Sequence, residues 1–85
     1  MPNSLSGLRS KAMLPEPTPS QIERVERQYS RLAGGEPVTA HLIGGAWYIF
    51  GSELAVLRIF HKQPQGRAGY SENRNTWYYA FEDKI

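Results

Sequence analysis

Aromatic and basic side chains interleave along the second half of this sequence, and they are its best candidates for binding chemistry. Tyrosine and phenylalanine rings can stack on nucleic-acid bases or fill pockets of a protein partner, while arginine and lysine attract phosphates and carboxylates. If the segments that carry them are strands, alternate residues project to the same face of a sheet. The residues that we expect on that face or in its adjoining turns are Tyr48, Phe50, Arg58, Phe60, Lys62, Arg67, Arg74 and Tyr78.

Patterns for catalysis or metal binding are much weaker. The chain has no cysteine, and its two histidines, His41 and His61, fall in different predicted strands. These histidines could hold a metal together with Glu53 or Glu72, but no spacing singles out such a set. We therefore predict no catalytic residue, no metal, no cofactor and no small-molecule substrate, and we expect that the protein is not an enzyme.

Composition narrows the class of partner. Eighty-five residues suit a single domain, and ten basic against eight acidic residues leave a net charge of only +2. This near balance favours a protein partner over nucleic acid. The longest apolar stretches, such as residues 46–50, are far shorter than the roughly 20 residues that cross a bilayer, so we expect no membrane span. The absence of cysteine is consistent with the reducing cytoplasm, where we place the protein.

The domain is expected to begin at residue 18. Residues 1–17 hold three of the six prolines and no hydrophobic period, which is typical of a disordered tail, and residues 18–85 form the single domain. Thr18, Pro19 and Gln21 make a capping box with proline at the first helical position. The apolar stripe of the helix that follows consists of Ile22, Val25, Tyr29 and Leu32, and Gly34-Gly35 ends it.

The next segments predict a hairpin. Residues 38–43 and 46–50 are rich in β-branched and aromatic side chains, and the pair Gly44-Gly45 suits a two-residue primed turn. The register then places Ala40 opposite Ile49 and His41 opposite Tyr48. One face carries Val38, Ala40, Leu42, Trp47 and Ile49 and is expected to meet the helix. The other face carries Thr39, His41, Ile43, Tyr48 and Phe50.

Residues 54–62 are ambiguous between strand and helix. Val56, Ile59 and Phe60 favour a strand, whereas Ser52 as an N-cap and Lys62 as a basic end favour a helix, and we adopt the strand. Residues 67–70 form a short strand and residues 76–82 a final one, and no internal repeat is evident. The predicted fold class is α+β, with one N-terminal amphipathic helix packed on an antiparallel β meander of three to five strands.

Function is predicted from this geometry. A single helix covers one face of a sheet, so the aromatic and basic face is left for a partner, unless both faces are buried in a small rolled barrel. We expect a non-catalytic module for protein–protein interaction through this face or a sheet edge, self-association included. The alternative is a DNA- or RNA-binding module that uses the same face with Arg58, Lys62, Arg67 and Arg74.

Overall fold

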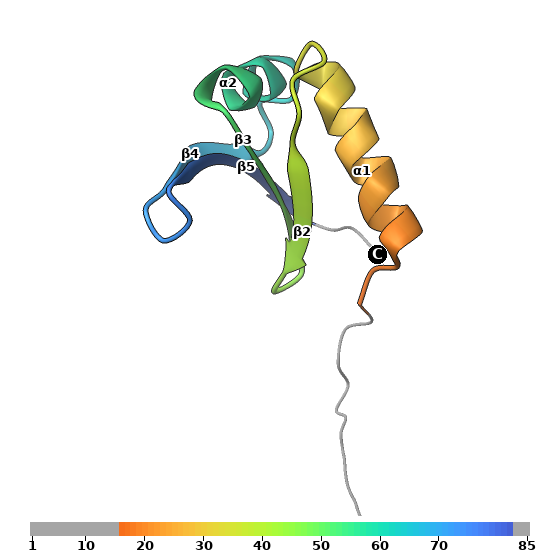
Figure 1. Ribbon diagram of the computed structural model, residues 1–85. Coiled ribbons are helices and arrows are strands. Elements are labelled where there is room, and N and C mark those ends of the chain that lie inside the picture. The colour runs from red at the N-terminus through yellow and green to blue at the C-terminus, as the bar shows by residue number, and fades with distance from the viewer. Residues whose placement is uncertain (1–15, 83–85) are drawn as a thin grey trace, which may run out of the picture.

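The computed structural model describes residues 16–82 and has two helices and a four-stranded antiparallel sheet (Figure 1). In chain order the elements are α1 (Pro19–Leu32), β2 (Thr39–Ile43), β3 (Ala46–Gly51), α2 (Glu53–Lys62), β4 (Arg67–Ser71) and β5 (Thr76–Glu82). The α+β class is therefore confirmed. The disordered tail predicted for residues 1–17 lies almost entirely outside the described residues. No helix within residues 16–82 has the length and apolar character of a transmembrane segment.

Helix α1 starts and ends as the sequence predicts. The Gln21 amide donates to Thr18 Oγ1 across 3.1 Å, and the Thr18 amide donates to Gln21 Oε1 across 2.8 Å, which completes the capping box. Beyond the helix, Gly34 and Gly35 take φ values of 74° and 94°, a region that side chains disfavour. Local sequence signals are sufficient to place this helix.

The first hairpin also follows the prediction, because Gly44 and Gly45 adopt positive φ values of 58° and 84° between β2 and β3. The register pairs Ala40 with Ile49 and His41 with Tyr48. Strand β2 lies at the edge of the sheet, and its Ala40 amide donates to Glu26 Oε2 of α1 across 2.9 Å. Helix α1 thus supplies a hydrogen-bond acceptor for a backbone amide of this edge strand, which would otherwise be unpaired.

The strand predicted for residues 54–62 is wrong, because Glu53–Lys62 forms helix α2. Ser52 caps its start by accepting the Ala55 amide across 3.1 Å. Ala55, Val56 and Ile59 are all fully buried, and only a helix brings these three positions onto one side. Burial of this stripe outweighs the β propensity of Val56 and Ile59, since strand propensity depends strongly on context.

The sheet is not a simple meander. Its order is β2-β3-β5-β4, so the last strand returns to the centre and pairs with β3, while β4 takes the outer edge. The elements form two successive α-β-β units, a repeat of topology that the sequence does not make evident. Trp47-Tyr48 in β3 and Trp77-Tyr78 in β5 occupy corresponding places in the two central strands.

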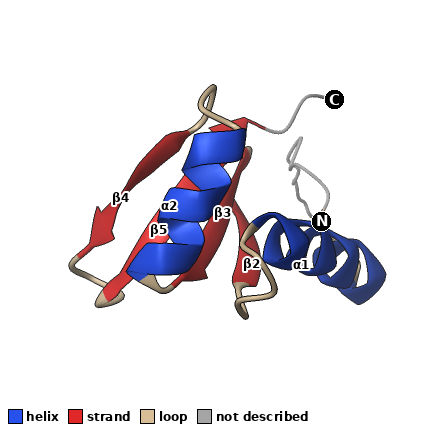
Figure 2. Cartoon of the chain, turned by 90° about the horizontal axis from the view of Figure 1, so that it is seen from above, coloured by secondary structure: helices blue, strands red, loops and turns tan. Residues whose placement is uncertain are grey.

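Both helices pack on the same face of this sheet. Tyr29 of α1 and Val56 and Ile59 of α2 join Ile49 and Tyr79 of the central strands in one hydrophobic core. Figure 2 shows α2 lying over β5 and α1 alongside β2. No other helix or strand of residues 16–82 remains to cover the opposite face, which we call the open face. A closed barrel is excluded, since β2 and β4 are edges.

Candidate functional site on the open face

A row of aromatic rings crosses the open face on the two central strands. Tyr48 and Phe50 project from β3, with ring centroids 6.1 Å apart, and Tyr78 of β5 lies 5.7 Å from Tyr48. His41 of β2 continues the row, its ring 5.5 Å from Phe50 and roughly edge-on. The structure therefore brings together three of the predicted site residues, Tyr48, Phe50 and Tyr78, as β-strand alternation requires.

The Tyr78 ring lies against the sheet because its neighbour in β4 is Gly69. A Cβ atom on Gly69 would approach the Tyr78 hydroxyl oxygen to 3.0 Å and its Cζ to 3.1 Å. A glycine opposite an aromatic residue leaves a shelf on which the ring rests. Gly69 was not among the predicted site residues, although a glycine inside a strand often signals a close approach of this kind.

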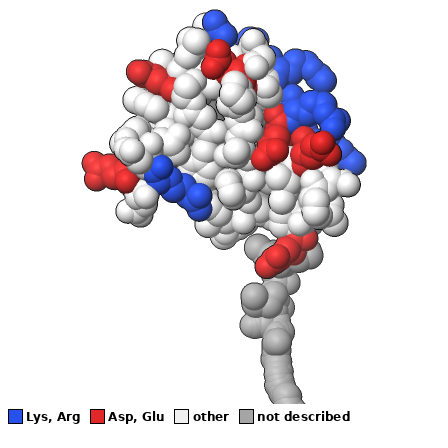
Figure 3. All heavy atoms as spheres, in the orientation of Figure 1, with Lys and Arg blue, Asp and Glu red and all other residues white. Residues whose placement is uncertain are grey.

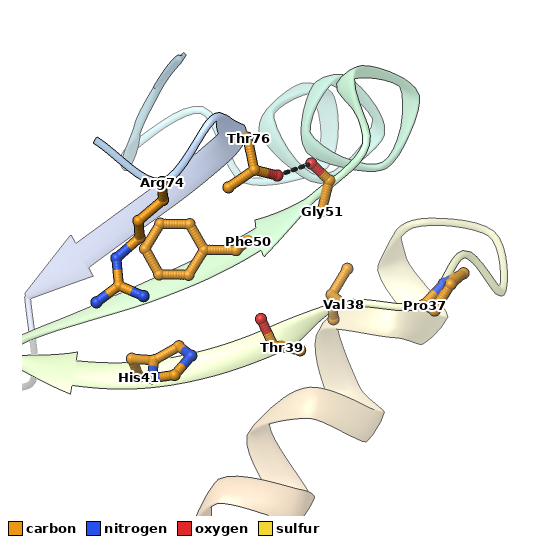
Figure 4. A pocket seen from close by; sticks show the side chains of 8 residues that line it. All are labelled: Pro37, Val38, Thr39, His41, Phe50, Gly51, Arg74 and Thr76. Atoms are coloured by element: carbon orange, nitrogen blue, oxygen red, sulfur yellow. Dashed lines mark hydrogen bonds between the residues drawn. The ribbon is translucent and has the colours of Figure 1, made fainter. Parts of the chain in front are cut away.

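Arg74 reaches over the open face from the β4–β5 turn. Its guanidinium carbon lies 4.6 Å from the centroid of the Phe50 ring, a cation–π arrangement. Figure 4 shows the Arg74 side chain beside the Phe50 ring, with His41 on the neighbouring strand. Phe50 is only 8% exposed. The Phe50 ring therefore lies under other side chains, Arg74 among them, and is not free on the surface.

The turn that carries Arg74 is held by its own side chains. The Arg74 amide donates to Ser71 Oγ across 3.3 Å. Asn75 takes a φ of 56°, which asparagine tolerates better than most residues, and its Oδ1 accepts a hydrogen bond from the Tyr70 hydroxyl. Sequence reasoning identified the turn but not the role of Asn75, because its contact depends on where Tyr70 falls in the register.

Two hollows flank the Arg74–Phe50 pair, and both residues line each of them. The first hollow, of about 390 Å³, also contacts Val38, Thr39 and His41 (Figure 4). The second hollow, of about 420 Å³, is bounded by other residues of the hairpins and central strands. Its remaining lining residues are Ile43, Tyr48, Ser71, Glu72, Asn73 and Tyr78. The open face thus offers two shallow depressions separated by one positively charged ridge.

Three predicted site residues do not belong to the open face. Arg58, Phe60 and Lys62 lie on α2, which packs on the opposite face of the sheet. Arg58 Nη1 instead donates to the Ala33 carbonyl at the end of α1 across 3.3 Å. These placements are wrong because they rest on a strand where the chain forms a helix. Arg67 starts β4 opposite Ala80, which places it on the open face at the outer edge.

Charge on the open face is nearly balanced. Arg67 and Arg74 are accompanied by Glu72 in the adjoining turn and Glu82 at the end of β5. Figure 3 shows most basic side chains gathered over α1, with acidic ones beside them, while much of the remaining surface in that view is uncharged. In the part of the chain that the structure describes, the single ion pair joins Arg27 and Glu23 on α1, with Nη2 and Oε2 3.8 Å apart.

Two tyrosines with raised pKa values lie away from the open face. Burial raises the pKa of Tyr29 to about 12, with a further contribution from nearby Tyr79, and burial also raises the pKa of Tyr79. Both tyrosines belong to the core beneath the helices. Among residues 16–82, no three histidine or acidic side chains lie close enough together to bind a metal ion.

Comparison with known proteins adds no relative to this picture. The chain matches no protein-family model, no curated protein and no solved structure. Function must therefore be argued from the geometry of the open face.

Proposed function

We propose that this protein is a non-catalytic protein-binding module whose contact surface is the open face of its sheet. The observation that carries the proposal is the pair Tyr48 and Tyr78, half-buried on adjacent central strands with ring centroids 5.7 Å apart and no described element above them. Tyrosine and arginine are enriched among the residues that dominate the energetics of protein interfaces, because each buries much area and keeps a polar group.

The balance of charge favours protein over nucleic acid as the partner. Arg58 and Lys62, which a basic binding face would need, lie on α2 across the sheet. Only Arg67 and Arg74 remain, against Glu72 and Glu82. Binding to single-stranded nucleic acid relies on a positively charged groove as well as stacking rings, and the open face supplies the rings without the excess of cations. The absence of cysteine supports a reducing compartment such as the cytoplasm for this interaction.

Selection from a peptide library displayed on phage tests the proposal. Peptides enriched on the wild-type protein should bind it measurably by fluorescence anisotropy. Tyr48→Ala and Tyr78→Ala should each weaken that binding by about tenfold or more, since both remove a ring from the contact surface. Phe60→Ala is the matched control, because Phe60 is an exposed aromatic residue on α2, away from the open face. Circular dichroism confirms that each variant is folded.

Three results would contradict the proposal. A library that yields no peptide for the folded wild-type protein would remove it. Peptides that lose affinity with Phe60→Ala and keep it with Tyr48→Ala would move the interface to the helical face. Salt-dependent binding of fluorescent single-stranded oligonucleotides that Tyr48→Ala abolishes would replace protein by nucleic acid as the partner.

A further inference from the structure

Arg74 is a cation held in place without an ion-pair partner among the described residues. Its guanidinium stacks on Phe50, and no carboxylate among residues 16–82 pairs with it. A guanidinium on an aromatic face keeps its edge free, and that edge presents N–H donors in the fork that a carboxylate accepts. The open face therefore has a ready position for one anionic group.

The position of Arg74 is fixed before any ligand arrives. Ser71 accepts the Arg74 amide, the Asn75 side chain accepts the Tyr70 hydroxyl, and the Phe50 ring supports the guanidinium from below. Each of these contacts restricts the conformation of Arg74 in the free protein. An unrestricted, exposed arginine would lose that conformational freedom only on binding. Preorganisation of this kind raises affinity, because less entropy is lost when the complex forms.

The two hollows specify what lies beside the anionic group. They border Arg74 on both sides, so a ligand that fills them must continue past the arginine in both directions. A terminal carboxylate would leave one hollow empty, whereas an acidic side chain within an extended peptide would not. In an extended chain, residues two positions apart project to the same side. The fitting pattern is therefore apolar–x–acidic–x–apolar.

We propose that the open face recognises an extended protein segment with an internal glutamate or aspartate that binds Arg74 and an apolar side chain two positions away on each side. This inference rests on the proposed protein-binding function and adds the chemistry of the partner. Glu72 at the rim of the second hollow repels a second acidic group there, so the acidic residue belongs at Arg74 and an apolar one beside Tyr48 and Tyr78.

A double-mutant cycle between protein and peptide tests the proposed contact between Arg74 and the acidic residue of the bound segment. The probes are synthetic fluorescent peptides of the apolar–x–Glu–x–apolar form, chosen from those that bind the wild-type chain, and the same peptides with Glu→Gln. For the wild-type protein, Glu→Gln should weaken binding by about tenfold, the usual effect of losing a charge-assisted hydrogen bond. For Arg74→Gln, the two peptides should bind equally. Arg24→Gln, on the exposed side of α1, is the control and should keep the full preference for Glu.

Each outcome decides one point. The peptide change Glu→Gln could lower the affinity equally for the wild-type protein and for the Arg74→Gln protein. That result would overturn the assignment of Arg74 and leave the protein-binding function standing. Peptides that bind the wild-type chain with no acidic preference would do the same. Failure of every peptide to bind would remove the proposed function and this inference with it. Because Arg74 lies in an exposed turn, its variant should keep the wild-type circular dichroism spectrum.

Discussion

The guanidinium of Arg58 donates a hydrogen bond to the Ala33 carbonyl across 3.3 Å, and so ties the second helix to the end of the first. Ala33 is fully buried, so its carbonyl has little access to water. A cation at this place also offsets the negative end of the α1 dipole. Gly34 permits the approach, since a Cβ atom there would lie 2.6 Å from Arg58 Nη1.

Arg58 should therefore matter for stability and not for binding. We expect Arg58→Gln to lower the free energy of unfolding by about 1 kcal/mol, because the Ala33 carbonyl loses a charged donor. Urea unfolding measures the change, with Lys62→Gln as the control at the exposed end of the same helix. Weaker peptide binding by Arg58→Gln with unchanged stability would return Arg58 to the binding surface.

Helix α2 can be checked by comparing two aliphatic residues two positions apart. Ile59 is fully buried and Leu57 is 49% exposed. We expect Ile59→Ala to lower the free energy of unfolding by about 3 kcal/mol, because it leaves a cavity beneath the helix. Leu57→Ala should change it by less than about 1 kcal/mol. A strand would place both residues on the same face, so equal losses in urea unfolding would contradict the helix.

Two glycines should respond differently to the same substitution. A Cβ atom on Gly66 would lie 2.7 Å from the Ala80 carbonyl oxygen, which is backbone and cannot move aside. We expect Gly66→Ala to lower the unfolding free energy by about 2 kcal/mol. For the matched change Gly69→Ala, the three atoms nearest to the added Cβ all belong to the Tyr78 side chain, which can shift, so its effect on stability should be under about 1 kcal/mol. Peptide affinity should instead fall, because the ring leaves its shelf.

Alkaline pH should destabilise the fold through Tyr29. Its pKa rises from 10.0 to about 12 in the folded state, where the side chain is only 6% exposed. The unfolded chain then releases this proton at lower pH than the folded chain, so stability is fully present below pH 10 and is lost as pH rises towards 12. The loss from this group should reach about 2 kcal/mol.

Urea unfolding at a series of pH values measures this dependence, and Tyr29→Phe is the control. The variant cannot ionise at this position, so its stability should fall less over the same range. Part of the loss of stability at high pH should remain in Tyr29→Phe, because the pKa of Tyr79 is also raised by burial. A variant as sensitive to alkali as the wild-type chain would contradict the assignment to Tyr29.

The candidate site was predictable where it depends on strands that local signals define. Alternation from the Gly44-Gly45 turn places Tyr48 and Phe50 on one face, and the same parity holds for Tyr78 in the last strand. The stacking of Arg74 on Phe50 was not predictable from the sequence. The contact joins the β4–β5 turn to β3, and it forms only because β3 pairs with β5 in the folded sheet. The sequence-based prediction misplaced Arg58, Phe60 and Lys62 for one reason: it treated as a strand the segment of residues 54–62, which forms a helix.

By itself, the sequence determined the elements whose causes are local: the capping box that starts α1, the glycines that end it, and the tight turn that sets the β2–β3 register. The tertiary structure decided the state of residues 53–62 and the place of β5. Buried Ala55, Val56 and Ile59 need partners on distant strands, and the pairing of Ile49 with Tyr79 joins residues far apart in the chain. Such contacts outweigh local propensity, and no short window of sequence contains them.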